Sequence, residues 1–256
     1  MSSWLYLVYF SFRRQLRFRR LAVAFVLFVI ISLVVGFSGS DRLWSATRFS
    51  RWIMEPAFCR FFLPIIALTF GTAVIGDERE DKTLVYLSIR PISRGSLFLA
   101  KLLGSVPLVL GISLGALFGL CATASACGEL PIPLLEMVWV FVPTVTLGAL
   151  AYLAFFGWLG VVFRNAILIG VAHVFLVEIF MGNVPGVLKQ ISISFYVRSM
   201  LYDAVPKPAV EVRVRGILEF QPFEGDEASV ALIVVAAGFL LLGTYWFSRR
   251  EYRDLT

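Results

Sequence analysis

The chain has 256 residues, of which 59% are hydrophobic and only 16% are charged. A soluble globular domain is about 45–50% apolar and about 25% charged, so a soluble fold could not bury this much apolar surface. The same composition excludes a disordered chain. The net charge of +6 does not by itself indicate a nucleic-acid partner, because the position of Lys and Arg relative to the apolar runs decides their role. We therefore expect a polytopic membrane protein.

Residues 1–20 are predicted to form an interfacial helix that lies at the membrane surface. Aromatic and aliphatic side chains recur at helical spacing over residues 5–16, and five arginines follow within residues 13–20. Trp and Tyr favour headgroup depth, and Arg favours anionic lipid. The alternative is an unstructured basic leader. A cleaved signal peptide does not fit, because the aromatic stretch precedes the basic residues. The arginine cluster favours a cytoplasmic N-terminus.

Six apolar runs are predicted to be transmembrane helices, because about 20 apolar residues cross the hydrocarbon core. The fold class is thus an all-α polytopic membrane protein in one transmembrane domain, residues 1–256. Six spans place both termini in the cytoplasm, in a multi-pass protein of the cell membrane. The fifth run is short, which suggests that part of it is buried against its neighbours. The predicted spans are residues 21–37, 58–75, 97–120, 137–163, 166–181 and 228–247.

Four glycines in the third run are spaced by seven, four and four residues, so they share one helix face and permit close backbone approach. Ordinary helix packing within one subunit is the favoured interpretation, ahead of a sliding or dimer surface. These glycines are Gly104, Gly111, Gly115 and Gly119.

The segment 182–227 is predicted to be a long outer loop between the fifth and sixth spans. Within it, residues 191–200 have the pattern of an amphipathic helix, and residues 210–215 alternate with period two, as in a short strand.

The segment 77–96 between the second and third spans is the densest charged stretch of the chain. Residues 77–82 are solvated and compatible with a helix. Pro91 should end that helix, because the residue before a proline avoids the α conformation. Ser93 or Ser96 can then cap the next helix. We expect a short surface helix, a break, and a fresh start into the third span.

The residues of this loop resemble the permeases of ATP-binding-cassette exporters of the type-2 class, also called type V exporters. Lys82 stands where that family often has Gly, and Tyr86 where Leu is common. The end of the chain, residues 247–252, is also similar to the family's usual ending. The matching residues of the loop are Glu78-Arg79-Glu80, Thr83-Leu84, Leu87-Ser88, Arg90-Pro91-Ile92-Ser93-Arg94 and Lys101.

The resemblance implies that the loop is a cytoplasmic coupling element, which docks on a separate ATPase subunit. It further implies two such ATPase subunits, a second permease copy, most simply as a homodimer, and possible accessory subunits. Without the resemblance, the loop would read as a solvated connection. The implied ATPase contacts are Glu78, Arg79, Glu80, Asp81, Lys82, Thr83, Leu84, Leu87, Arg90, Pro91 and Arg94.

This chain contains no Gly-x-x-x-x-Gly-Lys-Ser/Thr nucleotide motif, so we expect no enzyme activity and no cofactor in it, with ATP and Mg²⁺ on the partner ATPase. The predicted function is ATP-driven movement of a substrate across or out of the membrane. The alternative is an ATP-independent channel or scaffold subunit. Lipid is the expected surrounding, and nucleic acid is not an expected partner.

Glu178 lies in the fifth run, where ionisable residues are candidates for a substrate or gating role; His173 is five residues away, which on an α-helix is a different face. An intramembrane protease built on Ser38 is disfavoured, because Ser38 lies in a loop-like stretch. Cys121 and Cys127 could form a disulfide only in an oxidising compartment, and free thiols are favoured.

Overall fold

The computed structural model describes residues 3–16, 18–39, 49–80, 93–127, 134–183, 187–204 and 223–249. Within these ranges every regular element is a helix, which confirms the all-α prediction. The strand predicted at 210–215 lies outside the described residues. The elements are α1 (Ser3–Gln15), α2 (Phe18–Gly39), the π-helix η1 (Ser50–Phe62), α4 (Leu63–Gly71), α5 (Ala73–Glu80), α7 (Arg94–Cys127), α8 (Leu134–Val162), α9 (Ala166–His173), the π-helix η2 (Val174–Phe180), the 3₁₀ turns η3 (Met181–Asn183) and η4 (Val187–Ile191), α10 (Ile193–Ala204) and α11 (Gly225–Arg249).

Five of the described helical stretches are long and apolar enough to cross a membrane. The sixth candidate, Ala166–Phe180, is shorter. At 1.5 Å per residue, its length is about 22 Å, against a hydrocarbon core of about 30 Å. The six-span count therefore stays a prediction. The five stretches are Phe18–Phe37, Trp52–Arg79, Arg94–Cys127, Leu135–Val162 and Gly225–Arg249.

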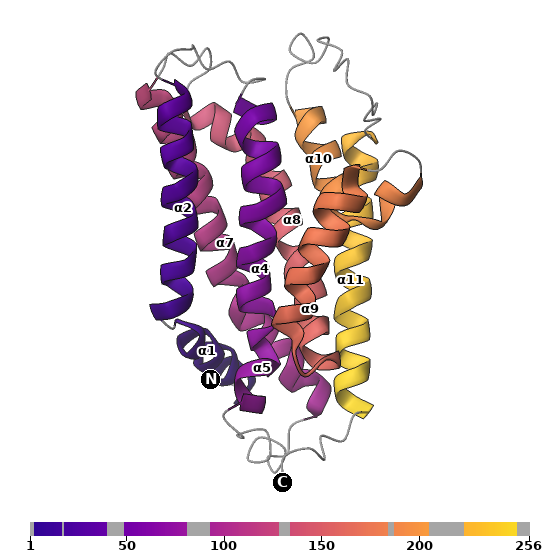
Figure 1. The fold of residues 1–256 in the computed structure, drawn as a ribbon. Helices are drawn as coiled ribbons and strands as arrows, with labels where there is room; N and C mark the ends of the chain where they lie inside the picture. Colours follow the sequence, from indigo (N-terminus) through magenta and orange to yellow (C-terminus); the bar gives the residue numbers. More distant parts are fainter. Residues whose placement is uncertain are drawn as a thin grey trace.

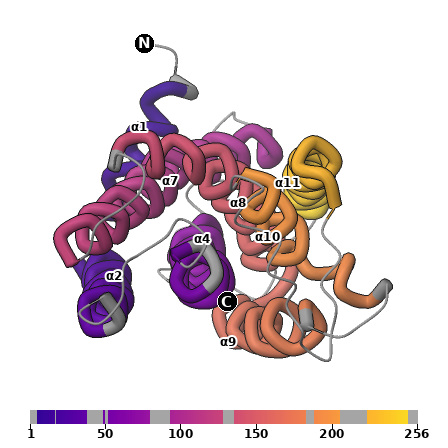
Figure 2. Tube along the Cα trace, turned by 90° about the horizontal axis from the view of Figure 1, so that it is seen from above, coloured from indigo at the N-terminus to yellow at the C-terminus, as the bar shows by residue number. Residues whose placement is uncertain are grey.

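The long helices stand side by side along one direction, with α1 lying across one end of the bundle (Figure 1). We call this end, where α5 finishes and α7 begins, the near end, and the opposite end the far end. Helix α8 packs against α11, α4, α7 and α10 and is the centre of the bundle, as the view along the helices shows (Figure 2). The stretch through α4 is 78% buried, whereas α2 and α11 are 17% buried. The outer helices thus expose apolar side chains where lipid is expected.

A close helix crossing joins α4 to α8 through glycines that the sequence pattern did not single out. A Cβ on Gly71 would meet the Cβ of Phe156 at 2.8 Å, and one on Gly160 would meet the backbone oxygen of Thr72 at 2.9 Å. Backbone atoms cannot move aside as a flexible side chain can, so these two positions accept only glycine without displacement of a helix. Small residues at helix crossings are the usual device for close packing in membranes.

The four glycines of α7 divide into two kinds. Gly104 lies against the backbone of α1, with the oxygen of Val8 at 2.9 Å from a Cβ position, and Gly119 lies against the ring of Phe28 in α2. These two glycines thus lie at close contacts between helices of the same chain. Gly111 and Gly115 have no atom within 4 Å of a Cβ position, so neither takes part in close packing within the described chain. Gly115 lines an open apolar groove of about 230 Å³ between α2 and α7.

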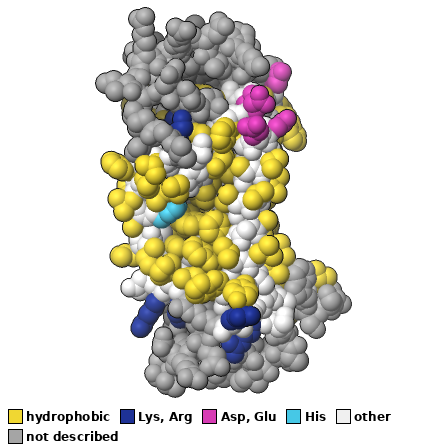
Figure 3. Space-filling view, turned by 90° about the vertical axis from the view of Figure 1, so that its right-hand side faces the viewer, with side chains coloured by type: hydrophobic (Ala, Val, Ile, Leu, Met, Phe, Trp, Pro, Cys, Tyr) yellow, Lys and Arg dark blue, Asp and Glu magenta, His cyan; other side chains and the backbone are white. Residues whose placement is uncertain are grey.

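Charge is distributed unevenly between the two ends of the molecule. On the face drawn in Figure 3, hydrophobic side chains form the middle, basic side chains gather at the near end and acidic side chains at the far end. Helix α11 repeats this polarity, with Asp226 and Glu227 in its first turn and Arg249 in its last. Acids at a helix N-terminus and a base at its C-terminus also complement the helix dipole.

Candidate functional site

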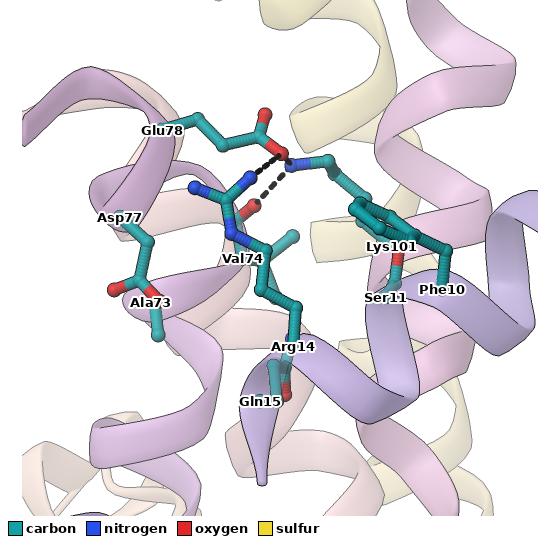
Figure 4. A pocket seen from close by; sticks show the side chains of 9 residues that line it. All are labelled: Phe10, Ser11, Arg14, Gln15, Ala73, Val74, Asp77, Glu78 and Lys101. Atoms are coloured by element: carbon teal, nitrogen blue, oxygen red, sulfur yellow. Dashed lines mark hydrogen bonds and ion pairs between the residues drawn. The ribbon is translucent and has the colours of Figure 1, made fainter. Parts of the chain in front are cut away.

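A group of charged side chains is buried at the near end, between α1, α5 and α7 (Figure 4). The side chain of Glu78, near the end of α5, is only 3% exposed. Its Oε1 forms ion pairs with the ammonium group of Lys101 and with the guanidinium of Arg14, the latter at 3.3 Å. A buried carboxylate is costly unless it is paired, and here two cations from two other helices compensate it.

The ion pair between Glu78 and Lys101 connects the two helices that flank residues 81–92. Helix α7 begins at Arg94 because Ser93 caps it: the backbone N–H of Ser96 donates to Oγ of Ser93 at 3.3 Å. This confirms the predicted cap. Lys101 follows two turns later on the buried face, where its ammonium also donates to the backbone oxygen of Val74 at 3.3 Å. The helix that enters the loop and the helix that leaves it are thus tied together.

Helix α1 is held in the same cluster by close packing and by polar contacts. Ser11 packs against Gly104, where the absence of a side chain lets the two backbones approach. Gln15 donates from Nε2 to Oγ of Ser105 at 2.8 Å. At the start of α2, Arg20 forms an ion pair with Asp77. The arginines that were expected to mark the membrane surface therefore also bind the acids of α5.

Arg79 extends the network to α8. Its guanidinium donates to the backbone oxygens of Phe163 and Val161, at 2.8 and 3.2 Å. These carbonyls lie at the C-terminal end of α8, where the last turn of a helix has no intrahelical donors, so a cation there satisfies them and complements the helix dipole. Through consecutive residues, α5 is thus connected to α1, α7 and α8.

The cavity beside these residues has a volume of about 20 Å³, which is room for about a single water molecule. It is too small for a substrate. The arrangement can hold helices in register and transmit displacement between them, and it has no space for a reaction.

The residues predicted to contact an ATPase divide into three groups. We expected Glu78 to contact an ATPase subunit, but α1 covers it. In this structure its carboxylate therefore lies inside the chain. Arg79 binds the end of α8, Glu80 is the last residue of α5, and Arg94 is exposed at the first residue of α7. The remaining contacts lie outside the described residues and stay predictions: Asp81, Lys82, Thr83, Leu84, Leu87, Arg90 and Pro91.

The expectation that Glu178 and His173 occupy different faces is wrong. The Nε2 of His173 lies 3.3 Å from Oε1 of Glu178. The reason is that residues 174–180 wind as a π-helix, whose i→i+5 repeat brings residues five apart together. Glu178 is fully buried.

A second carboxylate at the far end escaped the sequence reasoning. Glu55 in η1 pairs through Oε1 with Arg60 at 2.6 Å and with Arg198 of α10 at 2.8 Å, and the hydroxyl of Tyr202 donates to its Oε2. Burial, with the adjacent Glu55 carboxylate, raises the pKa of Tyr202 to about 12. The signal was an acid and a base five residues apart beside an apolar run, which is again the π-helical spacing.

The three thiols, Cys59, Cys121 and Cys127, are free, and only Cys127 is exposed.

Comparison with protein families places almost the whole chain in one of them. The family described as "ABC-2 family transporter protein" matches residues 10–252. Comparison with curated proteins gave no match.

Proposed function

The chain belongs to the ABC-2 family of transporter proteins, and from this premise we propose that it is the permease subunit of an ATP-driven transporter. It moves a substrate across or out of the membrane, and a separate subunit hydrolyses ATP. Mg²⁺ and ATP bind on that subunit, since the chain itself carries no Gly-x-x-x-x-Gly-Lys-Ser/Thr motif.

The observation that carries the proposal is the ion pair of Glu78 with Lys101 across the loop 81–92. A loop that docks on a moving ATPase must pass its displacement to the membrane helices. Because α5 and α7 are joined at the base of the loop, a displacement moves both helices together. The contacts of Arg14 and Arg79 extend that unit to α1 and α8.

The physical basis is linkage. ATP closes the ATPase dimer, and the closed dimer binds one arrangement of the permease helices better than the other, so the equilibrium between the two arrangements shifts. Alternating access and lateral extrusion are both compatible with this scheme. A coupling element needs rigidity at its base, and paired charges buried among apolar helices supply it, because separating them would leave a charge unpaired.

The assembly that follows contains two copies of this chain and two ATPase subunits in the cell membrane. We place the near end on the cytoplasmic side. The arginines of α1 and α2 lie there, and Lys and Arg are in excess on the cytoplasmic side of membrane proteins. The loop 81–92 leaves from the same end, as docking on a cytoplasmic ATPase requires.

The test is purification of the tagged chain from its native membrane in mild detergent, followed by an ATPase assay. An ATPase subunit should co-purify. Replacing Leu84 and Leu87 by Asp should release it, while the thermal stability of the permease stays unchanged, because these side chains belong to the docking surface. Arg164→Met is the matched control, since it changes an exposed residue at the same end and should retain the ATPase.

Two outcomes would contradict the proposal. A permease that carries no ATPase, under conditions that keep known transporters assembled, would favour an ATP-independent channel or scaffold. Retention of the ATPase by the Leu84 and Leu87 variants would place the docking surface outside the loop 81–92.

A further inference from the structure

Glu178 binds the beginning of α10 with both oxygens of its carboxylate. Oε2 accepts from Oγ of Ser192 at 2.6 Å and from the backbone N–H of Ser194 at 2.8 Å, while Oε1 accepts from the backbone N–H of Ile193 at 3.2 Å. The hydroxyl of Ser194 donates back to the backbone oxygen of Glu178 at 3.3 Å. Four hydrogen bonds thus join one turn of η2 to one turn of α10.

The same carboxylate is fixed from two other directions. The hydroxyl of Tyr152 in α8 donates to Oε2 at 3.0 Å, and the ring of His173 lies beside Oε1. Helix α8 is the centre of the bundle, so Tyr152 gives Glu178 a fixed support. The bonds to α10 are therefore the part of the network that can open while the rest stays in place.

Helix α10 packs against the middle of α8, on the side of the far end of the bundle. It has only 12 residues and is not one of the membrane-spanning candidates. Its inward side chains, Phe195, Val197 and Leu201, are fully buried, and Val197 lies against Gly148 of α8. Figure 2 shows α10 between α8 and the viewer at this end.

A second carboxylate holds the other half of α10. Arg198 and Tyr202 both bind Glu55 of η1. Each half of the helix is thus attached to a different neighbouring segment through one buried acid. The bonds of Glu178 to neutral hydroxyl and backbone donors can be exchanged for bonds to water when the helix moves away.

We propose that α10 is a gate at the far end of the bundle, and that Glu178 is the positioning residue that latches it shut. The proposal deepens the transport function proposed above: a pathway that opens at the far end requires α10 to leave α8. Glu178 acts through the N-terminus of α10 and does not touch a substrate.

The test measures whether the surface beneath α10 becomes accessible. Val197→Cys, in a full-length chain that also carries Cys59→Ser and Cys127→Ser, places a thiol under the gate. Its rate of labelling by a maleimide is measured in native membranes without added nucleotide. Cys121, which is buried in α7, reports in the same molecule on general loosening.

Loss of the latch should raise labelling at Val197→Cys selectively. Glu178→Gln places an amide N–H₂ against backbone donors, and we expect labelling at position 197 to rise about tenfold or more, as for loss of charge-assisted hydrogen bonds. Cys121 should change less than about twofold. Parallel increases at both thiols, or no increase at either, would overturn the proposal.

A matched pair of milder variants keeps the test decisive if Glu178→Gln fails to fold. Ser192→Ala and Tyr152→Phe each remove one hydroxyl that donates to Oε2 of Glu178, the first beside α10 and the second from α8. A latch predicts faster labelling at position 197 for Ser192→Ala and little change for Tyr152→Phe. Equal effects of the two variants would mean that Glu178 merely stabilises the fold.

A further measurement separates the latch from the transport function. With the ATPase subunit bound, ATP should increase labelling of Val197→Cys in the otherwise unmutated chain. If the latch variants behave as expected and ATP has no effect, the proposed coupling is wrong and the latch stands. If ATP opens the site and Glu178→Gln does not, the latch is wrong and the coupling stands.

Discussion

Replacing Lys101 by Met should destabilise the chain strongly, because it leaves the buried carboxylate of Glu78 with one weaker partner. The two side chains are 8% and 3% exposed. Removing one partner of a buried ion pair costs about 3–5 kcal/mol. Arg14 still lies 3.3 Å from the carboxylate, but its side chain is 24% exposed, so we expect a cost at the lower limit, about 3 kcal/mol.

The assay is thermal unfolding of the purified chain in detergent. For a chain of this size, 1 kcal/mol shifts Tm by about 2–4 °C, so Lys101→Met should lower Tm by about 6–12 °C. Arg164→Met is the matched control, because it removes a positive charge from an exposed residue at the same end. Such surface changes stay within about 0.5 kcal/mol.

A double-mutant cycle identifies the cause of the loss. Glu78→Gln alone leaves the Lys101 ammonium buried without its carboxylate. With both replacements no buried charge of the pair is left, and Arg14 can turn to water, so the double variant should recover about 2 kcal/mol or more relative to the sum of the single effects. Additive losses, or a Tm shift for Lys101→Met no larger than the control's, would refute the reasoning.

Three further predictions concern other parts of the chain. Gly160→Ala should lower Tm, because the new Cβ would meet the backbone oxygen of Thr72, just after α4, at 2.9 Å. Gly111→Ala has open space around it and should leave Tm unchanged or higher. Similar Tm shifts for both variants would contradict this account of the packing. Arg79→Gln should cost about 1–3 kcal/mol through the unsatisfied carbonyls of α8, seen as a lower Tm, and an unchanged Tm would exclude that role. Tyr202 has a pKa raised to about 12 by burial and by Glu55. The folded state therefore keeps a proton that the unfolded state loses, and stability should fall between about pH 10 and 12; Tyr202→Phe should lessen this fall in alkaline unfolding curves, and identical curves would contradict it.

The sequence predicted the helical elements well because each rests on local information. Apolar runs of sufficient length and serines before α7 are patterns of neighbouring residues, so the all-α class could be read directly and the cap narrowed to Ser93 or Ser96. The charged residues of α5 were also recognised as important. Their orientation could not be read, because whether Glu78 points to water or to Lys101 depends on where α1 and α7 pack.

The π-helical segments explain the error at Glu178. Reasoning from 3.6 residues per turn separates residues five apart, and this excluded a contact between His173 and Glu178. The same assumption hid the pairing of Glu55 with Arg60. Pro56 inside η1 is a local sign of an irregular helix, but it does not specify a π-helical turn, and residues 174–180 contain no proline. Glu178 also binds α10, which follows later in the chain and could not be placed from the sequence.

The partners of Glu78 and Glu178 fit opposite mechanical tasks. In a membrane, apolar contacts between helices gain little over contacts with lipid, so small residues and polar contacts fix how helices pack. Glu78 faces two cations, and separating them would leave charges unpaired. The donors to Glu178 are mostly neutral hydroxyls and backbone N–H groups, which water can replace singly. A permease driven from the near end needs stiffness where force enters and release where the pathway opens. A glutamate can serve in both places, because the free energy needed to separate it from its partners depends on whether those partners are charged.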